Sequence, residues 1–146
     1  MKKIIFVSFF LFGLITNFAL AEENDGFVAQ FFKELDINKD GIIDKRELQR
    51  HSKKEFNLMD TDKNNIISKR EFFVFICKKS CTEADCKCEE ATDFSEINEY
   101  FDIIDVNHDG EITYQEKLSS DTEEFHNFDA NHDGKIKKEE VEAKLY

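Results

Sequence analysis

The chain has 146 residues, and its 20 Lys and Arg against 32 Asp and Glu give a formal net charge of −12 at pH 7. A surface this acidic is repelled by nucleic acid and by anionic membranes, which excludes both as partners. Much of the acidity belongs to a repeated loop, described below.

Residues 1–21 differ in character from the rest of the chain. Lys2 and Lys3 form a basic start, residues 4–20 are almost wholly apolar, and residues 19–21 read Ala-Leu-Ala. This pattern is typical of a cleaved secretory signal, so we expect a secreted or periplasmic protein without stable membrane insertion after cleavage. A retained membrane anchor is the alternative, but the apolar run is short for a spanning helix.

Residues 36–47 (loop 1) read DINKDGIIDKRE and have the spacing of a calcium-binding loop. Ca²⁺ takes six to eight oxygen ligands, so a short loop must surround it with side chains at alternate positions and close with a bidentate glutamate. The tight turn needs a residue that accepts positive φ, and Gly41 supplies it at the sixth place. The loop therefore predicts a calcium site.

The same pattern recurs at residues 60–71 (loop 2), 105–116 (loop 3) and 129–140 (loop 4). Asn65 stands at the glycine place of loop 2, which Asn tolerates because it enters the left-handed region more readily than most residues. The eighth place of every loop is isoleucine: Ile43, Ile67, Ile112 and Ile136. A repeat at fixed positions indicates four related sites rather than chance.

These loops and their flanking helical patterns resemble the EF-hand calcium-binding family, and the close spacing is similar to small secreted or periplasmic EF-hand proteins of bacteria. The resemblance implies an all-α fold of four helix-loop-helix units and up to four Ca²⁺ ions. The seventh residue of each loop binds through its backbone carbonyl. The implied ligands are Asp36, Asn38, Asp40, Ile42, Asp44 and Glu47; Asp60, Asp62, Asn64, Ile66, Ser68 and Glu71; Asp105, Asn107, Asp109, Glu111, Thr113 and Glu116; and Asp129, Asn131, Asp133, Lys135 and Glu140.

The four sites are expected to differ in strength. Loop 1 has four carboxylates at the ligand positions and each other loop has three, so loop 1 is expected to be the best site. Lys137 stands at the ninth place of loop 4, where a carboxylate, a hydroxyl or a bound water usually helps. Loop 4 is therefore expected to be the weakest.

The resemblance also implies that loops work in pairs, with each eighth-place isoleucine in a short β-bridge to its partner. We expect one pair in residues 22–76, a Cys-rich linker at 77–92 and a second pair in residues 93–146. The connections within the pairs are short, and Ser52 with Glu55 and Ser120 with Glu123 are possible helix restarts. Each connection is therefore predicted to be two short helices or one kinked helix.

Residues 72–76, FFVFI, are apolar on every side, which predicts a buried segment at the centre of the first pair or between the pairs. An exposed patch for a partner is the alternative.

Four cysteines lie close together at Cys77, Cys81, Cys86 and Cys88. In an exported protein such a cluster favours two disulfides, and we prefer Cys77 with Cys88 and Cys81 with Cys86. A four-thiolate Zn²⁺ or Cu(I) site is the alternative, although it usually has a paired C-x-x-C spacing.

No nucleophile motif is present and calcium accounts for the carboxylates, so we expect no enzyme. His108 and His132 occupy the fourth loop place, which in the EF-hand family points away from the ion. The predicted function is calcium binding in an exported protein, as a buffer or a calcium-stabilised structural or interaction module. The alternatives are a calcium sensor for a dedicated partner and thiol redox or metal handling by the cysteines. A promiscuous sensor is disfavoured because only Met59 remains after the signal.

Overall fold

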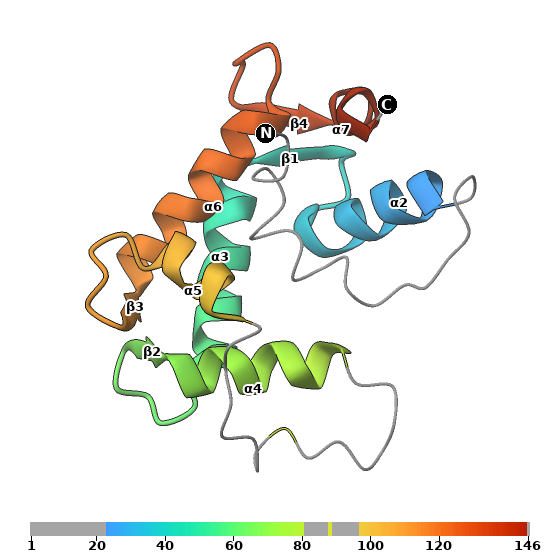
Figure 1. Cartoon of the computed structure of the whole chain (residues 1–146). Coiled ribbons are helices and arrows are strands. Elements are labelled where there is room, and N and C mark those ends of the chain that lie inside the picture. Colours follow the sequence, from blue (N-terminus) through green and yellow to red (C-terminus); the bar gives the residue numbers. More distant parts are fainter. Residues whose placement is uncertain (1–22, 81–87, 89–96, 146) are drawn as a thin grey trace.

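The computed structural model describes residues 23–80, 88 and 97–145, which form helices joined by loops and very short strands (Figure 1). The elements in chain order are α2 (Glu23–Leu35), β1 (Ile42–Asp44), α3 (Lys45–Met59), β2 (Ile66–Ser68), α4 (Lys69–Ser80), α5 (Asn98–Ile104), β3 (Glu111–Thr113), α6 (Tyr114–Phe128), β4 (Lys135–Lys137) and α7 (Lys138–Leu145). The predicted helix-loop-helix pattern is confirmed for these residues.

The two connecting segments are single, continuous helices. α3 and α6 each run for 15 residues, from the end of one loop to the start of the next. The prediction of a break at Ser52 or Ser120 is wrong, because Ser52 lies fully buried inside α3 and its hydroxyl donates to Asp121 of α6. A serine that has a tertiary partner does not need to cap a new helix.

The loops pair differently from the prediction. β1 of loop 1 pairs antiparallel with β4 of loop 4, with Ile43 opposite Ile136, and β2 of loop 2 pairs with β3 of loop 3, with Ile67 opposite Ile112. The isoleucine bridges are confirmed, but the assignment of neighbouring loops to one pair is wrong. We call loops 1 and 4 the outer pair and loops 2 and 3 the inner pair.

The length of α3 and α6 explains this pairing. At 1.5 Å per residue a 15-residue helix is about 22 Å long, so a straight helix holds its two flanking loops at opposite ends. α3 and α6 lie side by side and run in opposite directions, with β1 and β4 at one end and β2 and β3 at the other (Figure 1).

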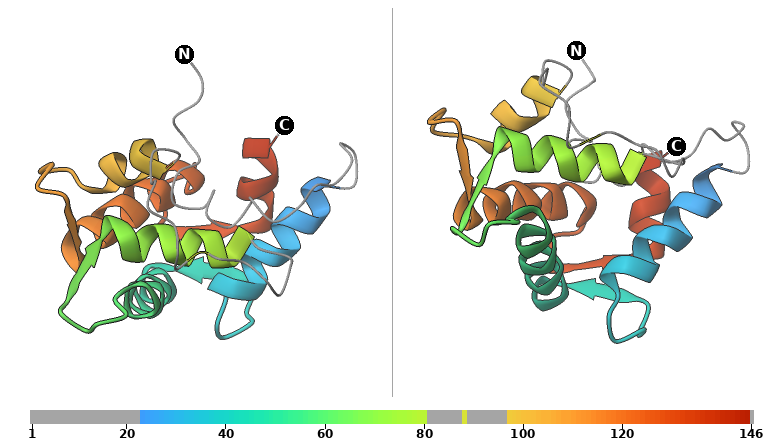
Figure 2. Two further views of the ribbon diagram at one scale, coloured as in Figure 1. Left: turned by 60° about the horizontal axis from the view of Figure 1, so that its bottom comes forward. Right: turned by 90° about the horizontal axis from the view of Figure 1, so that it is seen from below.

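Each pair has its own hydrophobic core. The core of the outer pair combines residues of α2, β1, α3, α6, β4 and α7: Val28, Phe31, Leu35, Ile43, Leu48, Phe125, Phe128, Ile136 and Val141. The core of the inner pair combines residues of α3, β2, α4, α5 and β3, together with Ile97: Phe56, Met59, Ile67, Phe72, Ile76, Ile97, Phe101, Ile104 and Ile112. The first and last helices of the outer pair, α2 and α7, lie together in both views of Figure 2.

The apolar segment of α4 belongs to the core of the inner pair. Phe72 and Ile76 are buried, and Phe73 and Phe75 are partly buried against the same cluster. The rings of Phe72 and Phe101 pack edge to face, with their centroids 5.5 Å apart. The prediction of a buried segment is therefore confirmed for these residues, and it lies in the core of the inner pair.

A disulfide joins Cys77 at the end of α4 to Cys88, which confirms one of the two expected bonds. Cys81 and Cys86 lie outside the described residues, as do the expected signal at 1–21 and most of the expected linker. Among the helices of the described ranges, none has the length and apolar character needed to cross a membrane.

Candidate calcium loops

The first aspartate of every loop is fixed by two backbone N–H groups. The N–H groups of the fifth and sixth loop residues donate to its two oxygens at 2.8–3.2 Å. These four aspartates, Asp36, Asp60, Asp105 and Asp129, are buried. Within the described residues, no lysine or arginine forms an ion pair with any of them. Buried carboxylates need a compensating charge, so this arrangement fits a bound cation.

The third and fifth residues are ordered in the same way. In loop 1 the Asn38 side-chain oxygen accepts from the Asp40 N–H at 2.7 Å, and Asp40 accepts from the Ile42 N–H at 2.9 Å. Asp62 and Asn64 repeat these bonds in loop 2, as do Asn107 with Asp109 and Asn131 with Asp133 in the other loops. The seventh residue, whose carbonyl is a predicted ligand, begins each strand: Ile42, Ile66, Glu111 and Lys135.

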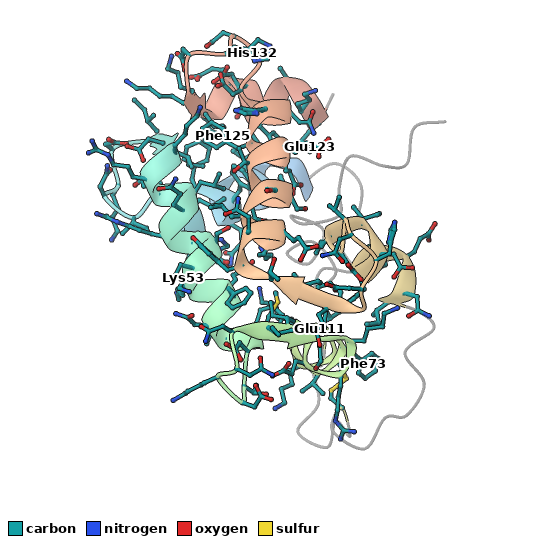
Figure 3. The ribbon with its side chains drawn as sticks, turned by 90° about the vertical axis from the view of Figure 1, so that its left-hand side faces the viewer. Lys53, Phe73, Glu111, Glu123, Phe125 and His132 are labelled. Atoms are coloured by element: carbon teal, nitrogen blue, oxygen red, sulfur yellow. A yellow bond between two sulfur atoms is a disulfide. The ribbon has the colours of Figure 1, made fainter. Side chains whose placement is uncertain are left out.

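Two places in each loop have positive φ. The sixth place has φ of 67–85° and is Gly41, Asn65, Gly110 or Gly134. The fourth place has φ of 57–62° and is Lys39, Lys63, His108 or His132. Figure 3 shows His132 at the tip of its loop, where this side chain is exposed.

The closing glutamate of each loop also lies in the first turn of the helix that follows. In loop 1 the Asp44 side chain accepts from the Arg46 and Glu47 N–H groups, and Glu47 accepts from the Asp44 N–H at 3.0 Å. Thr113 with Glu116 forms the same capping box, and Ser68 with Glu71 exchanges equivalent bonds. The prediction treated the ninth residue only as a ligand and missed this second role. The signal was visible in the sequence as Asp, Ser or Thr followed three residues later by Glu.

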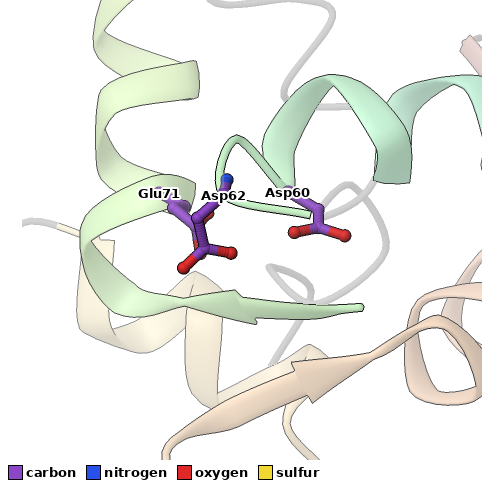
Figure 4. Close-up of side chains that lie close together, drawn as sticks. All are labelled: Asp60, Asp62 and Glu71. Carbon is purple, nitrogen blue, oxygen red and sulfur yellow. The ribbon is translucent and has the colours of Figure 1, made fainter. Parts of the chain in front are cut away.

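Loop 2 brings its carboxylates together most closely. Oxygens of Asp60, Asp62 and Glu71 lie within 4.8 Å of one another, and this is the one such group that the described residues contain (Figure 4). Burial raises the pKa of Glu71, but hydrogen bonds from Ser68 and Thr61 outweigh it and hold the pKa below its ordinary value. Three ionised carboxylates at this separation repel one another unless a cation lies among them.

In loop 3, the closing glutamate Glu116 has one carboxylate oxygen that is satisfied by the described residues and one that is not. Glu116 Oε2 accepts from the N–H and hydroxyl of Thr113 at 2.9 and 2.8 Å. Glu116 Oε1 is buried and has no hydrogen-bond partner within the described part of the chain. Buried acceptors are almost always satisfied, so an unsatisfied carboxylate oxygen in such a loop fits a metal ligand.

Loop 4 departs from the other loops at Lys137. Its ammonium lies 3.2 Å from Asp133 Oδ2 and forms an ion pair with this predicted ligand residue. This hydrogen bond lowers the pKa of Asp133. An open cavity of about 460 Å³ adjoins the loop and is lined by Lys45, His126, Asp129, His132, Asp133 and Gly134. That the fourth site is the weakest stays a prediction.

Comparisons with known proteins divide the chain along the observed pairs. The family model described as an EF-hand domain pair matches residues 49–119, which contain the inner pair. The model described as an EF hand matches residues 27–50 and 122–145, each of which contains one loop of the outer pair. The first model therefore spans the two loops that the structure joins through β2 and β3.

The curated relatives include kinases that are calcium-dependent by name. The chain is 31% identical over 102 residues to the calcium and calcium/calmodulin-dependent serine/threonine-protein kinase DMI-3 of Medicago truncatula, which is 62% of this chain and 19% of the kinase. It is 32% identical over 110 residues to guanylyl cyclase-activating protein 1 of Gallus gallus, which is 66% of this chain and 54% of that protein. The chain thus spans about a fifth to about half of these relatives. No solved structure matches significantly.

Proposed function

Since the chain belongs to the EF-hand calcium-binding family and binds Ca²⁺, we propose that it binds up to four ions, one in each loop, and that calcium holds its fold together. The observation that supports four sites is the shared arrangement of loop oxygens. The first aspartate makes equivalent hydrogen bonds in all four loops, as do the third and fifth side chains. Oε2 of the closing glutamate accepts from the N–H of the ninth residue in every loop.

The position of the loops supports a structural role for the ion. The first aspartate of loop 2 directly follows α3, and the closing glutamate of loop 1 lies in its first turn, so ligands flank the helix that both cores share. Each core is small, and a metal can decide folding at this size. When bound, calcium supplies positive charge at loops that otherwise collect buried carboxylates.

We further propose that the protein is exported and is not an enzyme, on the basis of residues 1–21, the Cys77–Cys88 disulfide and the absence of a nucleophile motif. A sensor for a dedicated partner is the second candidate. It is favoured by the exposed large apolar side chains near the loops: Ile37, Leu58, Ile103 and Val106. Thiol chemistry is a weaker candidate because Cys77 and Cys88 are joined to each other.

Calorimetric titration tests the calcium assignment. We expect a stoichiometry approaching four, falling by one in each of the Glu47→Gln, Glu71→Gln, Glu116→Gln and Glu140→Gln variants. An unchanged stoichiometry in these variants would contradict the ligand assignment. Calcium-dependent binding of a hydrophobic dye would favour the sensor over the buffer. Cell fractionation and N-terminal sequencing of the purified protein test export and cleavage after Ala21.

A further inference from the structure

Each of the two long helices has predicted ligands at both ends. α3 has Glu47 of the outer pair in its first turn and is followed by Asp60 of the inner pair. α6 has Glu116 of the inner pair in its first turn and is followed by Asp129 of the outer pair. A rotation or a shift of either helix at one pair therefore moves a ligand of the other pair.

The middle of these helices is joined by buried charges. Lys117 of α6 is 1% exposed, and its ammonium lies 2.6 Å from Asp121 Oδ2 and 3.3 Å from Glu55 Oε2 of α3. Ser52 of α3 donates its hydroxyl to Asp121, and Lys79 of α4 lies 2.9 Å from Glu55. We call these five side chains the central network.

The central network lies between the two hydrophobic cores. Along α3, Leu48 belongs to the outer core and Phe56 and Met59 belong to the inner core, with Ser52 and Glu55 between Leu48 and Met59. Figure 3 shows Phe125 at the outer end of the contact between α3 and α6, where it is fully buried. The contact between the long helices is therefore apolar toward each pair and charged in between.

Stability alone does not require charged side chains at this place, since apolar residues can serve as well. Burial lowers the pKa of Lys117, but Asp121 and Glu55 outweigh it and hold that pKa above its ordinary value. Desolvation raises the pKa of Glu55, and Lys117 and Lys79 bring it down to about 2. Replacing a complete buried ion pair by apolar residues is often neutral or stabilising, whereas directional bonds fix one register between helices.

We propose that Ser52, Glu55, Lys117 and Asp121 are positioning residues that couple calcium binding at the inner pair to calcium binding at the outer pair. The proposal rests on the proposed function, because both pairs must bind calcium. The network makes α3 and α6 move as one unit, so closing the ligands at one pair sets the helix ends at the other. The coupling is reciprocal, as any linkage between two binding sites must be.

The coupling is measured as a ratio of affinities in the full chain. Calcium titration gives the affinity of the outer pair under two conditions: with the inner pair intact, and with the inner pair inactivated by Glu71→Gln and Glu116→Gln. The ratio of these two affinities measures the coupling. We expect this inactivation to weaken the outer pair at least about fivefold, the lower end of typical coupling. The same ratio is then measured after Glu55→Gln, Lys117→Met and Asp121→Asn together, which removes the three buried charges of the network at once and leaves only the part-exposed Lys79 without its partner. We expect the ratio to fall below about twofold.

The matched control is Lys54→Met, which removes an exposed lysine from α3 next to Glu55 and should leave the ratio unchanged. Hydrogen exchange in calcium gives a second readout. Inactivating the inner pair should raise exchange in α2 and α7 of the unaltered chain, and it should not do so in the network variant. Should the triple variant fail to fold, Ser52→Ala removes one bond of the network and should lower the ratio partially.

An equal ratio in the network and control variants would overturn the proposal, because a purely structural network changes stability without changing the ratio. A ratio near one in the unaltered chain would also overturn it, while leaving the calcium stoichiometry and the proposed function intact. Absence of calcium binding by the unaltered chain would overturn both.

Discussion

The inner and outer loop pairs share one backbone pattern but differ in how far their carboxylates converge. In the inner pair, Asp60, Asp62 and Glu71 already lie within 4.8 Å of one another, and Glu116 has a buried oxygen without a partner among the described residues. In the outer pair, Asp44 caps α3 and Lys137 occupies an oxygen of Asp133. Counting carboxylates favours loop 1, whereas their arrangement favours loop 2. The comparison indicates that a carboxylate that also caps a helix or pairs with a lysine contributes less to a calcium site than its charge alone suggests.

Removing calcium from both pairs should have the largest effect. A ligand at about 1,000 times its Kd stabilises a fold by about 4 kcal/mol per site, and the loops hold carboxylates that repel one another when empty. We expect the thermal midpoint to fall by at least about 10 °C in excess chelator. Circular dichroism melts with and without calcium check this, and an equal midpoint contradicts a structural role for the ion.

Inactivating one loop in each pair compares the calcium affinities of the two pairs directly. Glu71→Gln should remove the tightest binding step, weakening it at least about tenfold, whereas Glu140→Gln should remove the weakest step. Both substitutions remove one negative charge at the same loop position, so each is the control for the other. Titrations in which Glu140→Gln costs more affinity would reverse the order of the pairs that the geometry indicates.

Acid should loosen the central network, in which Glu55 forms ion pairs with Lys117 of α6 and with Lys79 of α4. The pKa of Glu55 is lowered from 4.5 to about 2 in the folded chain, so its stabilisation is complete above pH 4.5 and is lost as the pH falls toward 2. The loss is roughly 3 kcal/mol at most. Urea unfolding of the chelated protein across this range checks it. Glu55→Gln should show a flatter dependence, and an equal slope argues against these ion pairs.

The smallest effect is expected at loop 4. Lys137→Asp removes the ammonium from Asp133 and supplies a ligand oxygen, which should tighten this site roughly fivefold and reduce the difference between the pairs. Lys138→Asp is the matched control, because it changes the net charge equally at the adjacent residue. Equal tightening by both variants would mean that charge alone acts.

Most of the site could be predicted because its residues lie within single loops. Asp36, Gly41 and Glu47 have fixed spacing, and in every loop the first aspartate and Oε2 of the closing glutamate accept the same backbone N–H groups. The loop pairing could not be predicted in this way, because it depends on whether α3 and α6 are straight. Ser52, which the sequence offered as a helix start, instead bonds to Asp121, 69 residues away. Local patterns contain no information about such a partner.

The pairing of β1 with β4 has a consequence for the order in which the fold can form. Loop 1 is synthesised before the other loops, but its partner strand ends at Lys137, so the outer pair stays incomplete until that strand has emerged. The inner pair needs only residues as far as Thr113 for its bridge. The nested topology therefore makes the inner pair the earliest unit that can assemble, and a chain stopped after Phe128 keeps that unit while loop 1 lacks its β-bridge.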